Sequence, residues 1–110
     1  MGQYRPEEGS FEVNTSRIAV IVARWNSEVT DGLLEGAVRA LGRHGISGEA
    51  VEVYRVPGAF ELPLASQRAA RTGRFDAVIS LGCVIRGDTP HFDYVCSAAT
   101  DGLTRAALDT

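Results

Sequence analysis

The run Arg17–Ala23 constrains the fold more than any other part of the chain. It is short, almost continuously apolar and rich in isoleucine and valine. Runs of this kind are typical of a strand that is buried on both faces, as strands in a parallel sheet are. The sequence therefore predicts a parallel sheet that carries helices on its two sides.

Strand-like and helix-like segments alternate along the rest of the chain. Two further strands are expected at Ala50–Val56 and Asp76–Gly82. The helices are expected to begin at Asn26 or Ser27, at Glu61 and at Thr89, and to end at Gly42–Gly45, at Arg71 and near Leu108. Alternation with short connections predicts an α/β fold, a three-layer sandwich whose parallel sheet is wound by right-handed crossovers.

Local signals predict the starts and the buried faces of these helices. The side chain of Asn26 or Ser27 can cap the first helix, and Thr89 followed by Pro90 is a typical start for the third. Apolar residues at helical spacing predict the faces that are buried. They are Val29, Leu33, Leu34, Ala37, Val38 and Leu41 in the first helix, and Phe92, Val95, Cys96, Ala99, Leu103 and Ala106 in the third.

The length of 110 residues suits one small domain. We expect an extended segment over residues 1–16 and a single α/β domain over residues 17–110. Within the first segment, Phe11–Val13 alternates and can pair as a strand with a neighbouring subunit. A three-stranded sheet leaves two open edges, so either a further strand is missing or a partner covers an edge.

Composition and charge argue against several classes of function. Hydrophobic residues make up 45% and charged residues 23%, and the formal net charge is −3. A nucleic-acid surface would need a basic patch, and a membrane span would need about 20 apolar residues. We therefore expect a cytoplasmic protein that binds neither nucleic acid nor membrane. Cys83 and Cys96 form no metal pattern and are expected to be free thiols.

Three loops leave the carboxyl ends of the expected strands, and they should lie on one rim of the sheet. They are Arg24–Asn26, Pro57–Glu61 and Cys83–Thr89. In open α/β sheets ligands bind beyond the carboxyl ends of the strands, where helix N-termini present free N–H groups. The convergence of these loops predicts a ligand site.

Several residues of these loops have both a functional and a structural interpretation. Trp25 can stack on a heterocycle, or it can be a core or interface residue. Glu61 can accept hydrogen bonds from a polyol, or it can stabilise the start of a helix. Gly58 lets the backbone come close to a ligand, although any tight turn would also use it.

The segment Arg86–Thr89 can bind an anion through its backbone N–H groups and Arg86. The carboxylate of Asp88 argues against this, so only its backbone N–H would help. His91 can transfer protons near neutral pH, or it can be an ordinary surface histidine. The chain lacks dinucleotide, nucleoside triphosphate and zinc motifs, so no cofactor or metal is expected.

The three loops together resemble the 6,7-dimethyl-8-ribityllumazine synthases. The resemblance rests on Ala23–Asn26, Val56–Pro63 and Gly82–Val95, and it covers residues 17–110. It implies a flavodoxin-like winding without the family's final strand and helices. The implied reaction condenses 5-amino-6-(D-ribitylamino)uracil with 3,4-dihydroxy-2-butanone 4-phosphate in riboflavin biosynthesis, without a metal or redox cofactor.

The resemblance also implies a role for individual residues. Trp25 matches the aromatic that stacks on the pyrimidine, and His91 matches the histidine that transfers protons. The other expected substrate contacts are Ala59, Phe60 and Glu61 for the ribityl chain, Cys83, Val84 and Ile85 for the uracil, and the amides of Asp88 and Thr89 for the phosphate. Asn26 and Gly58, which lie in the same motifs, complete the expected substrate-binding set.

The family assembles as homopentamers, some of them in icosahedral shells, with active sites between neighbouring subunits. Its members continue past Thr110 and contribute an aromatic and an arginine to the neighbour's site. The chain is therefore expected to hold one wall of a shared site. The alternative is a module on the same fold without catalysis, either a shell subunit or a protein that binds lumazine or flavin.

Overall fold

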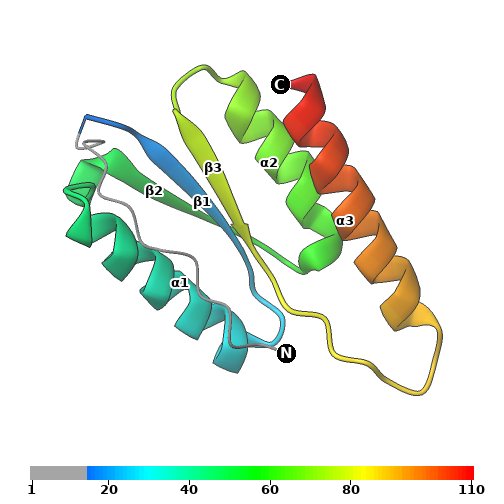
Figure 1. The fold of residues 1–110 in the computed structure, drawn as a ribbon. Helices are drawn as coiled ribbons and strands as arrows, with labels where there is room; N and C mark the ends of the chain where they lie inside the picture. Colours follow the sequence, from blue (N-terminus) through cyan, green and yellow to red (C-terminus); the bar gives the residue numbers. More distant parts are fainter. Residues whose placement is uncertain (1–14) are drawn as a thin grey trace, which may run out of the picture.

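The computed structural model describes residues 15–110, and Figure 1 shows the fold. The elements follow one another as β1 (Ile18–Ala23), α1 (Ser27–Arg43), β2 (Val51–Val56), α2 (Leu62–Arg71), β3 (Ala77–Leu81) and α3 (His91–Asp109). Short 3₁₀ turns at Gly48–Ala50 and Ala59–Glu61 precede β2 and α2. The predicted alternation is confirmed, whereas the expected strand at Phe11–Val13 lies outside the described residues.

The sheet is parallel, and its strand order is β2-β1-β3. Ile18 pairs with Val51 on one side and with Ala77 on the other, so the strands begin together and their carboxyl ends meet at one edge. Helix α1 covers one face of the sheet, while α2 and α3 cover the other (Figure 1). The predicted α/β fold with three layers is confirmed, and the order 2-1-3 is that of flavodoxin-like winding.

Strand β1 is the centre of the core, and every one of its residues is buried. Ile18 and Val20 pack with Ile46 beneath α1, and Ala19 and Ile21 face the opposite layer beneath α2. Each large aliphatic side chain that is removed from water contributes about 1.5–3 kcal/mol. The almost continuous apolar run of β1 is therefore explained by the burial of both of its faces.

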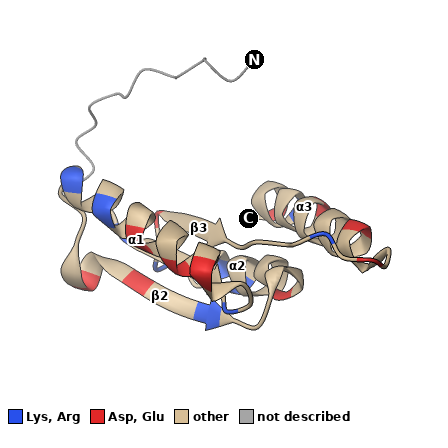
Figure 2. Ribbon diagram, turned by 90° about the horizontal axis from the view of Figure 1, so that it is seen from below, with Lys and Arg blue, Asp and Glu red and all other residues tan. Residues whose placement is uncertain are grey.

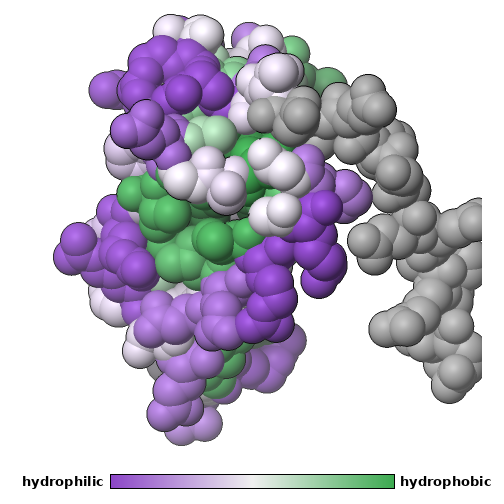
Figure 3. All heavy atoms as spheres, turned by 90° about the vertical axis from the view of Figure 1, so that its left-hand side faces the viewer, coloured by the Kyte–Doolittle hydropathy of each residue, from purple (hydrophilic) through white to green (hydrophobic). Residues whose placement is uncertain are grey.

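The predicted buried face of α1 is only partly correct. Leu34 and Leu41 pack against the cluster beneath the helix, but Val29, Leu33 and Val38 are 45%, 41% and 39% exposed. The reason is the narrow sheet, because the apolar stripe of the helix is wider than the surface available to cover it. Figure 3 shows an apolar patch between hydrophilic areas on the side where α1 and β2 lie.

The predicted start of α3 is also corrected. The helix begins at His91, and Pro90 precedes it instead of occupying its first position. The carbonyl of Pro90 accepts the N–H groups of Asp93 and Tyr94 at 3.0 and 3.3 Å. The Thr89 hydroxyl does accept the backbone N–H of His91, at 3.4 Å, as a capping side chain would, although the helix itself begins one residue later than predicted.

Charged residues of both signs are interspersed along the ribbon of the domain (Figure 2). One cluster of polar side chains joins the amino ends of β1 and β2 to the loop before β3. At its centre, Glu52 on β2 accepts hydrogen bonds from Tyr54, Arg74 and Arg17. The hydrogen bond from Tyr54, followed by that from Arg74, lowers the pKa of Glu52. Among the described helices, none is long and apolar enough to span a bilayer.

The close packing of α3 on α2 leads to a stability prediction. A Cβ atom at Gly102 would lie 2.6 Å from Cγ of Pro63, whereas one at Gly36 on α1 would meet nothing within 4 Å. We expect Gly102→Ala to lower the free energy of unfolding by about 1–3 kcal/mol. The control Gly36→Ala should raise it by about 0.5–1 kcal/mol, because alanine favours helix. Urea unfolding of both variants measures the difference, and equal stabilisation by both would contradict the predicted clash.

Candidate active site

The three loops that follow the strands enclose one open cavity of about 320 Å³. Its lining comes from all three loops and from the first turns of α3. The lining residues are Trp25, Asn26, Ala59, Phe60, Glu61, Cys83, Val84, Ile85, His91 and Val95. The predicted convergence of the loops is confirmed. Gly58, Asp88 and Thr89 are not part of this lining, and Val95 is a lining residue that the sequence had placed only on the buried stripe of α3.

Trp25 lies on the surface of the rim and is 63% exposed, so it is not a core residue. Its ring rests against the backbone of Gly58, where an added Cβ would lie 2.7 Å from Cε3 of the ring. The backbone N–H of Trp25 donates to the carbonyl of Pro57 at 3.0 Å. The loop after β2 therefore supports one side of the indole, and the indole also borders the cavity.

Glu61 has the structural one of the two roles that the sequence left open, and its geometry leaves room for the other. Its Oε1 accepts the N–H of Gly58 at 2.9 Å, and its own N–H donates to the Gly58 carbonyl at 3.2 Å. This reciprocal pair closes the 3₁₀ turn before α2, which confirms the structural interpretation. The other carboxylate oxygen accepts no hydrogen bond from the described residues, so it can still accept one from a ligand.

The predicted capping role of the Asn26 side chain is wrong. Asn26 directly precedes α1, but its side chain makes no capping hydrogen bond. Its Nδ2 instead donates to the backbone carbonyl of Cys83 at 2.9 Å, across to the loop that follows β3. The backbone of Asn26 is left-handed, with φ 63° and ψ 48°, and this conformation separates it from the geometry of an ordinary N-cap.

Arg86 is turned toward the first turns of α3. Its guanidinium lies 4.3 Å from the ring centroid of Phe92 and 3.7 Å from a carboxylate oxygen of Asp93. The predicted anion-binding role of its side chain is therefore not supported by its position. Asp88 and Thr89 lie on the exposed segment that leads to His91, so backbone N–H groups are what this segment can offer to an anion.

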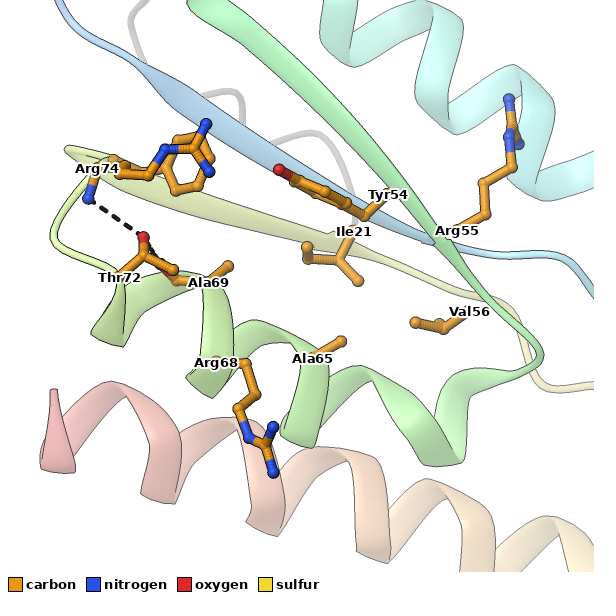
Figure 4. Close-up of a pocket in the computed structure, with 10 residues that line it drawn as sticks. Ile21, Tyr54, Arg55, Val56, Ala65, Arg68, Ala69, Thr72 and Arg74 are labelled. Carbon is orange, nitrogen blue, oxygen red and sulfur yellow. Dashed lines mark hydrogen bonds between the residues drawn. The ribbon is translucent and has the colours of Figure 1, made fainter.

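A second cavity of about 360 Å³ lies between β2 and α2 (Figure 4). Its interior is largely apolar, with Ile21, Val56 and Phe75 among its lining residues. The Thr72 hydroxyl at its rim already accepts the backbone N–H of Arg74. The first cavity, by contrast, holds an imidazole, a carboxylate oxygen and an aromatic surface, which are groups that can bind and convert a ligand.

The described residues contain no group of three or more His, Cys, Asp and Glu side chains able to hold a metal ion. Cys83 and Cys96 are free thiols, as the sequence predicted. The fold and the cavity at the carboxyl ends of the strands define an α/β domain of the kind that binds small molecules at its rim.

The family model described as 6,7-dimethyl-8-ribityllumazine synthase matches residues 15–110. The chain belongs to this family. It is 53% identical to the 6,7-dimethyl-8-ribityllumazine synthase of Salinibacter ruber over 103 residues, which cover 94% of this chain and 66% of the relative. It is 58% identical to that of Kineococcus radiotolerans over 107 residues, covering 94% of this chain and 65% of the relative.

A third relative of the same name, from Parabacteroides distasonis, is 52% identical over 97 residues, covering 88% of this chain and 61% of the relative. The chain thus spans about two thirds of the length of the curated relatives that it matches.

The contact between Trp25 and Gly58 leads to a prediction about the site. In Gly58→Ala the new methyl group would overlap the indole, so the ring must move away from the loop after β2. Because Trp25 is the sole tryptophan, its emission spectrum reports this movement directly. We expect a shifted emission maximum for Gly58→Ala and none for Gly32→Ala, whose added Cβ would meet nothing within 4 Å. Identical spectra for Gly58→Ala and the parent protein would show that the glycine does not set the position of the ring.

Proposed function

We propose that the chain acts in the synthesis of 6,7-dimethyl-8-ribityllumazine from 5-amino-6-(D-ribitylamino)uracil and 3,4-dihydroxy-2-butanone 4-phosphate, a transferase step of riboflavin biosynthesis. The observation that carries the proposal is one cavity, in a member of this family, that brings together Trp25, Glu61 and His91. These three side chains supply a stacking surface, a hydrogen-bond acceptor and a group for proton transfer.

The cavity suggests how the two substrates are divided between the loops. The pyrimidine stacks on Trp25, and its polar edge meets the backbone of Cys83–Ile85. The ribityl hydroxyls donate to the unpaired oxygen of Glu61. The phosphate of the second substrate meets backbone N–H groups at Asp88 and Thr89, on the segment that leads into α3. This arrangement holds two reactants in a fixed relative position, which lowers the entropic part of the barrier.

His91 lies where the two substrates would meet, because it follows the proposed phosphate segment and also lines the pyrimidine cavity. The uracil amine attacks the ketone and loses water to form an imine. Phosphate is then eliminated, the ribitylamino nitrogen attacks the remaining carbonyl to close the ring, and a second water leaves. Each step needs a proton to be added or removed, and the imidazole of His91 performs these transfers.

We also propose that copies of the chain associate, with a homopentamer or a larger shell as the assembly that the family resemblance favours. Strand β2 has an unpaired edge within the described sheet, and Val53 on this strand is 40% exposed. An open strand edge beside apolar side chains is a surface that proteins usually cover. Light scattering after size-exclusion chromatography measures the mass, and a monomer at all concentrations would contradict the proposal.

The activity is tested by mixing both substrates with the protein and measuring the fluorescence of the lumazine product. We expect His91→Ala to lower kcat by about 10²–10⁴-fold while the affinity for the product changes little. His44→Ala, in the residue that follows α1, is the matched control and should retain the parent rate.

Two outcomes would oppose this assignment. Equal losses of turnover and product affinity in His91→Ala would remove the catalytic role of the imidazole. Binding of the lumazine without any turnover, even when the additional residues of a full-length relative are supplied as a second polypeptide, would favour the alternative of a ligand-binding or shell module.

A further inference from the structure

One hydrogen bond joins the loop after β1 to the loop after β3. Nδ2 of Asn26 donates to the carbonyl of Cys83 at 2.9 Å, in a partly buried position, and both residues line the candidate cavity. The two residues belong to loops on neighbouring parallel strands, so the bond crosses the rim at the place where the strands have ended. It therefore fixes the separation of two walls of the cavity.

This bond is the hydrogen-bonded anchor of the loop after β3. Within the described residues, the backbone of 83–88 makes no other hydrogen bond to the rest of the domain. The side chain of Arg86 also contacts Asp93 and the ring of Phe92, and exposed ion pairs of this kind contribute little, while Val84 packs against the apolar cluster beneath α2. The Cys83–Ile85 backbone is therefore held by the packing of Val84 and by the hydrogen bond from Asn26, which among the described residues is its one polar link to the loop after β1.

The backbone of Asn26 is shaped for this contact. It is the one residue other than glycine in the described part that has a positive φ. Asparagine tolerates the left-handed region better than most residues. The carbonyl of Asn26 meanwhile accepts the N–H groups of Val29 and Thr30 and so begins α1. Because the backbone already begins the helix, the side chain is left to reach across the rim.

The neighbouring residue, Trp25, shows which parts of the site the bond between Asn26 and Cys83 holds in place. Trp25 immediately precedes Asn26, and its backbone N–H donates to the carbonyl of Pro57. The loop after β2 thus holds the stacking ring, and Asn26 holds the Cys83–Ile85 backbone relative to that ring. We propose that Asn26 is a positioning residue that sets the distance between the aromatic surface and the backbone that meets the pyrimidine edge. This inference rests on the proposed function and assigns Asn26 a role other than direct contact with the substrate.

The test uses the two cysteines of the chain as reporters of local opening. Cys83 carries the carbonyl that Asn26 holds, and Cys96 lies on α3. In the protein without ligand, N-ethylmaleimide labels both thiols, and mass spectrometry of peptides gives the two rates separately. Asn26→Gly keeps the left-handed backbone and removes the amide. We expect it to raise the labelling rate of Cys83 about fivefold, the effect of one lost hydrogen bond, with no change at Cys96.

Two further variants distinguish the loss of the Asn26 amide from other effects of substitution at this turn. Ser27→Ala changes the exposed residue next to Asn26 and should leave both labelling rates at the parent value. Asn26→Ala removes the amide and also disfavours the left-handed backbone, so it should affect Cys83 at least as strongly as Asn26→Gly. A variant that only destabilises the whole domain would raise the labelling of both cysteines and would not support the proposal.

Binding of 6,7-dimethyl-8-ribityllumazine completes the test. We expect its affinity to fall by about five- to tenfold in Asn26→Gly. Weaker binding with unchanged labelling of Cys83 would mean that Asn26 contacts the ligand directly, which overturns the proposal. Parent-like labelling of Asn26→Gly would also overturn it. If the parent protein binds no lumazine, the proposed function fails, while the labelling rates still decide whether Asn26 holds the loop.

Discussion

The burial of β1 on both faces is the constraint on which the rest of the structure depends. A strand with apolar residues on both sides needs a layer on each, and α1 and α2 supply those layers. It also needs a neighbour along each edge, and β2 and β3 pair with it there in parallel. Parallel pairing of strands that begin together places their following loops on the same rim. The position of the candidate site is thus a consequence of how the core is built.

Much of this could be predicted from the sequence, because periodicity reports burial and the topology follows from it. The predictions of the element order, of the parallel sheet and of the convergence of the three loops are all correct. The buried face of α1 was only half correct, because Val29 and Val38 obey helical spacing although the sheet beneath them is too narrow to cover them. Periodicity records which residues are apolar and does not record how much surface is present to bury them.

The roles of single polar residues were harder to predict. Asn26 and Thr89 both suit a helix cap by residue type, yet the Asn26 side chain makes no capping bond and Thr89 bonds the N–H of His91 from one residue before the N-cap position. A cap is a local interaction, whereas the side chain of Asn26 bonds to the carbonyl of Cys83, which is 57 positions away in the chain. The packing of Trp25 on Gly58 is likewise a contact between loops. Such contacts could be foreseen only as a general convergence of the loops on the rim, and their atoms could not be assigned.

At this rim, a structural role for a residue does not exclude a proposed functional one. Glu61 uses one carboxylate oxygen to close its own turn, and this bond holds the other oxygen in place. Trp25 is supported on one side by Gly58, so its orientation is set before a ligand arrives. Asn26 begins α1 with its carbonyl and reaches Cys83 with its amide. Each of these side chains is held by contacts within the protein itself. A rim held in this way loses little conformational freedom when a ligand binds. A structural explanation for such a residue is therefore compatible with its proposed role in binding a ligand.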